Sequence, residues 1–131
     1  MTFVDTSALV AFLDRDAARH QEVVGSLAQL LRRRRAVTHN YVVIETAALA
    51  HRRLGANVVR RLLEDLVPAL DVAWVDASLQ RAAASAYLRA LRRRSSLVDH
   101  VSFALMRERG IALALALDRH FAAEGFGVLP P

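Results

Sequence analysis

The spacing of apolar positions changes several times along the chain, and each change marks an expected helix or strand. The short apolar run 2–4 meets Asp5–Ser7, residue types that cap helices, before apolar residues recur at helical spacing up to Leu13. This order predicts a strand followed by a helix. One apolar stripe over 17–34, closed by arginines that suit the helix dipole, predicts a second helix.

The next part of the chain repeats this alternation of strand and helix. A short strand is predicted over 36–38, followed by a helix over 40–53 that Asn40 caps and Gly55 ends. Another helix is expected to continue through Leu66, before a proline interrupts it.

The second half has the same organisation. Segment 70–75 alternates well enough for a strand, and 77–94 is expected to form a helix ending in three arginines. Ser95 or Ser96 should cap a further helix that stops at Gly110.

The apolar segment 111–117, which ends on Asp118, is the clearest strand signal in the chain, and a helical turn and a last strand follow it. Strands and helices therefore alternate with short joins. This pattern favours a three-layer α/β/α fold around a mostly parallel sheet, in one domain over residues 1–131.

The amino-acid composition excludes several classes of enzyme and metal site. The 131 residues are 54% hydrophobic, and all 18 basic residues are arginine, with no lysine and no cysteine. P-loop kinases, Schiff-base enzymes, thiol nucleophiles and cysteine-ligated zinc sites are therefore excluded. No signal peptide or membrane-length apolar stretch is evident, so we expect a cytoplasmic protein.

Four of the acidic residues stand inside apolar runs, namely Asp5, Glu45, Asp99 and Asp118. A carboxylate in such a place must be protonated, paired or bound to a metal, because burying its charge costs several kcal/mol. Asp5 and Asp118 end predicted parallel strands, where the ligand sites of open α/β sheets lie. If the four carboxylates converge, their oxygens favour a hard cation such as Mg²⁺ or Mn²⁺.

Each acid also has a purely structural interpretation. Asp5 and Asp118 could cap helices, and Asp99 could be a first-turn acid that the helix dipole favours. Glu45 is different, because a mid-helix acid with apolar neighbours on its own face has no capping role. Ser7 is an accessory candidate, since its hydroxyl could cap a helix and also bond a site carboxylate.

Arginine runs are the other prominent feature. The runs, with the pairs 52–53 and 60–61, are typical of solvated helix ends, but guanidinium groups also bind phosphate through two parallel hydrogen bonds. The candidates for contact with the phosphates of a nucleic acid are the two runs: Arg32, Arg33, Arg34 and Arg35, and Arg92, Arg93 and Arg94. The aromatic residues Tyr41, Trp74 and Tyr87 are interpreted first as core residues.

Four motifs together resemble the PIN-domain ribonucleases, and most of all the small stand-alone toxins of the VapC type. They are FVDTSAL from Phe3, NYVVIETAAL from Asn40, SLVDHVSFALM from Ser96 and LDRHFAAEGF from Leu117. The resemblance implies an Mg²⁺-dependent endoribonuclease with the catalytic quartet Asp5, Glu45, Asp99 and Asp118, in which Asp5 and Asp99 bind the metal directly. It further implies an RNA substrate, a homodimer and a VapB-type antitoxin that occupies the active-site groove. A metal-activated water is then the expected nucleophile.

The chain departs from this pattern at two places. Many relatives carry an acid where His120 stands, and others have a hydroxyl residue shortly before the fourth acid, where this chain has Ala116 and Leu117. Both departures bear on a second metal site and on the role of Asp118. A haloacid-dehalogenase-type phosphotransferase is disfavoured, because Ser7 stands where it needs a second aspartate and no lysine is present. The alternative from another class is a catalytically impaired PIN-fold module that binds RNA or docks an antitoxin.

Overall fold

The computed structural model describes residues 1–131 and is built on a five-stranded sheet with the order β3-β2-β1-β4-β5. Every neighbouring pair of strands is parallel, so the expected α/β/α class is confirmed and the sheet is entirely parallel. The strands are β1 (Thr2–Val4), β2 (Ala36–His39), β3 (Asp71–Ala73), β4 (Leu113–Leu115) and β5 (Gly127–Leu129).

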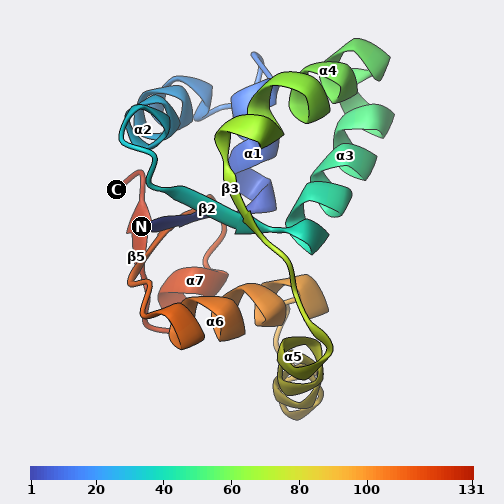
Figure 1. Ribbon diagram of the computed structural model, residues 1–131, viewed down its shortest axis with the longest axis vertical. Helices are drawn as coiled ribbons and strands as arrows, with labels where there is room; N and C mark the ends of the chain where they lie inside the picture. Colours follow the sequence, from blue (N-terminus) through green and yellow to red (C-terminus); the bar gives the residue numbers. More distant parts are fainter.

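Helices cover both faces of the sheet, as Figure 1 shows. The first group lies on one side and comprises α1 (Thr6–Leu13), α2 (His20–Arg32), α3 (Asn40–Leu54) and α4 (Ala56–Arg61). The second lies on the opposite side and comprises α5 (Ala77–Arg89), α6 (Leu97–Arg109) and α7 (His120–Ala123). A π-helical turn (Leu62–Leu66) and a 3-10 turn (Val67–Ala69) connect α4 to β3.

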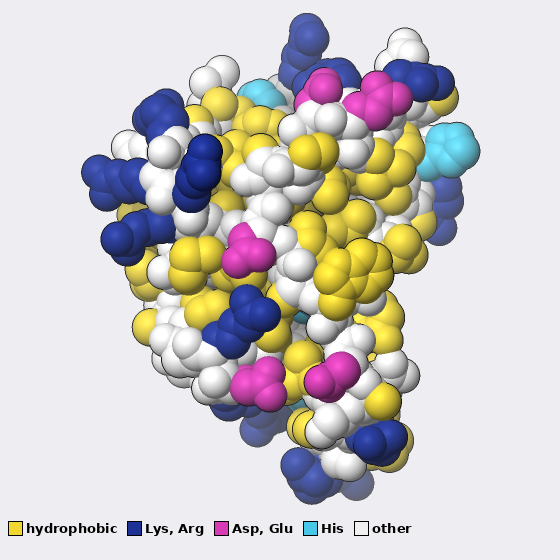
Figure 2. Space-filling model, viewed as in Figure 1, with side chains coloured by type: hydrophobic (Ala, Val, Ile, Leu, Met, Phe, Trp, Pro, Cys, Tyr) yellow, Lys and Arg dark blue, Asp and Glu magenta, His cyan; other side chains and the backbone are white.

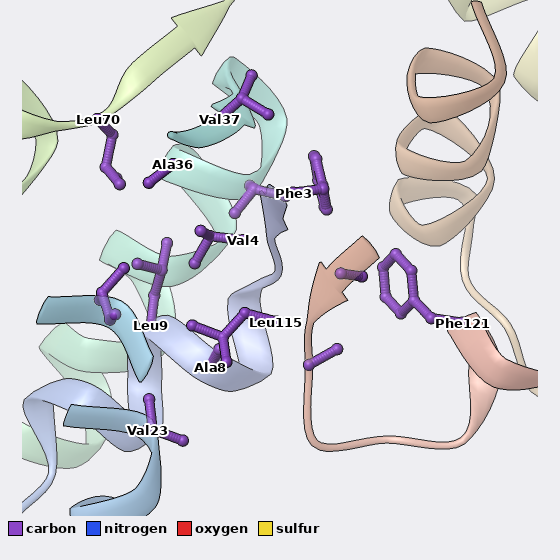
Figure 3. Close-up of a cluster of buried hydrophobic side chains, with 14 of the residues drawn as sticks. Phe3, Val4, Ala8, Leu9, Val23, Ala36, Val37, Leu70, Leu115 and Phe121 are labelled. Atoms are coloured by element: carbon purple, nitrogen blue, oxygen red, sulfur yellow. The ribbon is translucent and has the colours of Figure 1, made fainter. Parts of the chain in front are cut away.

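The core forms because successive side chains of a strand point to opposite faces of the sheet. Phe3 and Val4 are both fully buried, and Figure 3 shows Phe3 directed toward Phe121 on one side while Val4 faces Leu9 of α1 on the other. The Phe3 and Phe121 rings stack with centroids 5.9 Å apart. Each such buried side chain contributes about 1.5–3 kcal/mol, so β1 holds the two helical layers together.

Several expected boundaries differ in the structure. Helix α5 ends at Arg89, so Arg92–Arg94 lie in the turn before α6 and do not close a helix. Of the expected strand 111–117, only Leu113–Leu115 pairs, because the neighbouring strands β1 and β5 are themselves three residues long. Helix α6 ends as predicted, with Gly110 in the left-handed conformation at φ 65°.

Two interpretations of individual side chains were wrong. The cap of α3 is His39, whose Nδ1 accepts a hydrogen bond from the Val42 amide, whereas Asn40 accepts one from the Val75 amide. Trp74 is 80% exposed and lies outside the core, because it follows the edge strand β3 rather than a central one.

Arginine and apolar side chains are distributed differently over the surface. On the face drawn in Figure 2, most basic side chains lie toward the rim, over the end of α2, around α4 and at the tip of α5, while hydrophobic side chains are interspersed with acidic and some basic ones nearer the centre. No helix is long and apolar enough to cross a membrane.

Candidate active site

The four acids singled out in the sequence line one cleft of about 420 Å³ at the carboxyl edge of the sheet. Asp5 follows β1, Asp118 lies just beyond β4, Glu45 projects from α3, and Asp99 stands in the first turn of α6. The chain brings them together because β1 and β4 are adjacent and parallel, so both strands end at the same edge.

Asp5 is held by Ser7 at the start of α1. Its carboxylate oxygen Oδ2 accepts hydrogen bonds from the Ser7 amide at 3.1 Å and from the Ser7 hydroxyl at 2.7 Å. The same hydroxyl oxygen accepts a bond from the Leu117 amide at 3.0 Å, which connects β1 to the segment after β4. Ser7 thus both fixes one oxygen of Asp5 and leaves the other, Oδ1, without a hydrogen bond.

The electrostatic environment of Asp5 is unfavourable for a bare carboxylate. Burial, followed by the nearby charges of Asp118 and Asp99, raises the pKa of Asp5 from 3.8 to about 7, although the Ser7 bonds act in the opposite direction. Only 3% of the residue is exposed, so water cannot stabilise the charge. A bound cation would neutralise it.

Asp99 has a capping role and a site role together. Its Oδ2 accepts a hydrogen bond from the Ser96 amide at 2.8 Å, and Ser96 bonds back to the Asp99 amide, which completes a capping box at the start of α6. The first-turn interpretation is therefore correct for this oxygen. Nδ1 of His120 lies 2.9 Å from the same Oδ2 and 3.7 Å from Oδ1 of Asp118.

These contacts decide which groups are closest to one another. One ligand atom each of Asp99, Asp118 and His120 lie within 4.8 Å of one another, whereas Asp5 and Glu45 line the same cleft but stand outside this closest group. The His120 ring thus stands beside Asp99 and Asp118, while Asp5 contributes to the cleft from the end of β1.

The donor set nevertheless fits a hard cation. Asp5 and Asp99 use only Oδ2 in hydrogen bonds, Asp118 uses only Oδ1, and Glu45 uses neither carboxylate oxygen. At least one oxygen of every acid is therefore available, and no lysine or cysteine competes for them. Such an oxygen set suits Mg²⁺ or Mn²⁺.

His39, at the carboxyl end of β2, is a buried residue that the sequence did not single out. Its Nε2 lies 2.9 Å from the hydroxyl of Ser102, which itself donates to the Val98 carbonyl, so the imidazole must be the donor in this bond. Burial lowers the pKa of His39 to about 4, which keeps the ring neutral. His39 therefore ties the start of α3, which carries Glu45, to α6, which carries Asp99.

The arginine runs lie at different distances from this edge of the sheet. Arg32–Arg35 end α2 and lead into β2, so they stand at the amino edge, opposite the cleft. Arg92–Arg94 precede the end of α6 that bears Asp99, but Arg93 pairs with Glu124 at 3.4 Å. The basic residue that does line the cleft is Arg53 of α3, whose position on the same helical face as Glu45 was a signal already present in the sequence.

Comparison with known proteins gives a consistent picture. Residues 2–126 match the PIN domain family. The chain is 37% identical over 134 aligned positions, covering 100% of it and 99% of the relative, to a protein of Mycobacterium tuberculosis named 23S rRNA-specific endonuclease VapC20. The crystal structure of that VapC20, described as a sarcin-ricin loop cleaving toxin, superposes with a TM-score of 0.87 at 35% identity over 96% of both chains.

A more distant structure shares the fold alone. FitAcB from Neisseria gonorrhoeae superposes with a TM-score of 0.73 at 17% identity, over 98% of this chain and 96% of that one. With the full-length match to VapC20 and the acidic cleft at the carboxyl edge, these findings show that the chain belongs to the PIN-domain family and is similar to its VapC-type ribonuclease toxins.

Proposed function

We propose that this chain is a metal-dependent endoribonuclease, the toxin of a VapBC-type toxin–antitoxin pair. The observation that carries the proposal is the cleft in which four carboxylates meet, each with an oxygen free of hydrogen bonds. The full-length similarity to VapC20, whose name specifies 23S rRNA, supports an RNA substrate and makes ribosomal RNA the target class to test.

Each residue of the acidic cleft has its own role in the proposed reaction. Asp5 and Asp99 would hold Mg²⁺ or Mn²⁺ through their free oxygens, while Glu45 and Asp118 would accept hydrogen bonds from an attacking water. When bound, the cation supplies Lewis acidity: it lowers the pKa of water, polarises the scissile phosphate and neutralises charge on the leaving oxygen. Ser7 keeps Asp5 oriented, and His39 fixes the spacing of the helices that carry Glu45 and Asp99.

His120 supports a site for one cation rather than two. Its ring occupies the space between Asp99 and Asp118 and satisfies an oxygen of Asp99 that a second ion would otherwise use. The histidine thereby bonds two neighbouring carboxylates, Asp99 through its ring and Asp118 through its backbone amide, at the position where many relatives place another acid.

Assembly as a homodimer is also part of the proposal. An apolar groove of about 370 Å³ lies between α3 and α6, and Ile44, 68% exposed, and Leu97, 37% exposed, line it. Glu45 lines both this groove and the acidic cleft. A second copy packed on the groove would bury the apolar surface and bring two cleavage sites near each other, beside which a VapB-type antitoxin could occlude the cleft.

The competing function is a module that binds RNA or an antitoxin without cutting. The departures at His120 and at Ala116 and Leu117 favour it, whereas the presence of all four acids in one cleft opposes it.

Removing the metal with EDTA distinguishes a metal-dependent nuclease from a module that only binds. Purified protein should cut a labelled RNA carrying the sarcin-ricin loop sequence in Mg²⁺ or Mn²⁺, and cleavage should stop when EDTA exceeds the metal. Binding without cleavage in either metal would establish the module, and cleavage that survives EDTA would overturn the metal-dependent mechanism.

A further inference from the structure

One arginine stands on the wall of the acidic cleft. Arg53 is the basic side chain among the residues that line it, and it follows Glu45 and Leu49 at intervals of four residues. Residues spaced by four share a face of a helix, so one side of α3 presents an acid, an apolar residue and a cation to the cleft in that order.

The guanidinium group of Arg53 has no partner within the protein. The ion pairs that arginines make are Arg19–Glu22, Arg60–Glu64, Arg93–Glu124 and Arg107–Glu124. Arg53 is in none of them and makes no side-chain hydrogen bond, although acidic residues line the same cleft. Two helical turns, about 12 Å of axis, separate its backbone from that of Glu45, which is farther than the one-turn spacing of helical ion pairs.

An unpaired cation in the cleft would reduce the electrostatic repulsion between its carboxylates and RNA. The carboxylates that bind a metal also repel the phosphates on either side of the bond to be cut, since RNA is a polyanion. A guanidinium offers a planar fork that matches two phosphate oxygens, and its positive charge offsets part of this repulsion. The other arginine runs lie at the amino edge of the sheet or in the turn before α6, and neither lines the cleft.

We propose that Arg53 forms a phosphate subsite, which holds the phosphodiester group of a nucleotide flanking the cleaved bond and so sets the path of the RNA strand along α3. This inference rests on the proposed function, because it needs RNA in the acidic cleft. The subsite acts by positioning: it affects how the strand binds, while the acids act on the scissile phosphate. Leu49, between the two charges, gives the intervening nucleotide an apolar surface.

The test compares two adjacent arginines of the same helix. Arg52 is exposed like Arg53 and carries the same charge, but it does not line the cleft. Binding of a fluorescein-labelled single-stranded RNA is measured by anisotropy in EDTA, which prevents cleavage, over a series of NaCl concentrations. Arg53→Ala should weaken binding about tenfold at low salt, as expected for a lost charged hydrogen bond. It should also reduce the log–log salt slope by about 0.7, the value for one phosphate contact on a single strand.

Kinetics in Mg²⁺ distinguish positioning from catalysis. Arg53→Ala should raise the KM for RNA while kcat stays near the wild-type value. Arg53→Lys keeps the charge but not the planar fork, so its KM should lie between those of wild type and Arg53→Ala. Arg52→Ala should resemble wild type in both assays. If Arg53→Ala and Arg52→Ala behave alike while wild type cuts RNA, the subsite is refuted and the nuclease stands. If wild type neither binds nor cuts RNA, both proposals fall. If Arg53→Ala impairs only capture by a protein partner, Arg53 does not bind phosphate.

Discussion

Replacing Asp5 with asparagine should stabilise the metal-free protein, and by more at high pH than at low pH. A carboxyl group whose pKa rises from 3.8 in the unfolded chain to about 7 in the fold takes up a proton when the chain folds at a pH between these two values. Stability is therefore fully present below pH 3.8 and is lost as the pH rises toward 7. At about 1.36 kcal/mol per pH unit, the total loss is about 4 kcal/mol, of which about 3 kcal/mol falls between pH 5 and 8.

The wild-type protein alone would not reveal this loss, because His39 acts in the opposite direction. Its pKa is lowered from 6.5 to about 4, so it contributes stability that is present above pH 6.5 and lost as the pH falls toward 4. The magnitude is about 3 kcal/mol over that interval. The two effects nearly cancel between pH 4 and 6.5, and only the difference between wild type and Asp5→Asn isolates the carboxylate.

The assay is urea unfolding in EDTA at pH 5 and pH 8. Asparagine keeps the shape of the side chain, and its amide oxygen can accept both Ser7 bonds, so α1 should retain its cap. The stability difference between Asp5→Asn and wild type should grow by about 3 kcal/mol from pH 5 to pH 8. Asp76 offers a matched control, since it caps α5 through its side chain but is exposed, and Asp76→Asn should differ from wild type equally at both pH values. A difference for Asp5→Asn that does not grow with pH would refute the account of a desolvated carboxylate.

Three further outcomes are expected. An RNA with a 2′-deoxynucleotide at the cleaved position should still be cut, because the proposed nucleophile is water rather than the 2′-hydroxyl; products ending in 2′,3′-cyclic phosphate would contradict the proposal. In calorimetric titration, His120→Ala should bind Mn²⁺ at least as tightly as wild type, whereas weaker binding would make His120 a metal ligand. Wild type should be a dimer in light scattering at micromolar concentration, and Ile44→Arg should be a monomer, since it places a charge on the exposed wall of the apolar groove; a wild-type monomer would exclude the dimer.

The order of elements could be predicted from the sequence because local patterns determine it. A strand that is buried on both faces needs a continuous apolar run, and such runs before Asp5 and Asp118 placed both acids at strand ends. The lengths of the elements could not be predicted in the same way. Pairing of β4 is limited by the lengths of β1 and β5, which are set elsewhere in the chain. In the segment after α5, Arg93 pairs with Glu124, 31 residues away, and local sequence patterns do not indicate this contact.

The contacts in the candidate site likewise include local ones, which the sequence could predict, and long-range ones, which it could not. That Glu45 needs a polar environment followed from its apolar neighbours on the helix, and the bond from Ser7 to Asp5 spans only two residues. The contacts of His120 with Asp99 and of His39 with Ser102 join residues 21 and 63 positions apart, and nothing in one sequence indicates that they meet. Arg53 was accessible to sequence reasoning, because its spacing of eight from Glu45 places both on one helical face.

Changing one oxygen of Asp99 tests whether the acidic cleft cuts RNA with a bound metal. Asp99→Asn removes a charge at nearly constant shape and can still accept the Ser96 bond, so α6 should keep its capping box. Glu108→Gln makes the equivalent change on an exposed position of the same helix, outside the cleft. Under saturating Mg²⁺, RNA cleavage by Asp99→Asn should fall at least about 100-fold while its circular dichroism spectrum stays that of wild type, and Glu108→Gln should cut normally. Equal rates for wild type and a folded Asp99→Asn would show that the four-carboxylate cleft is not the cleavage site.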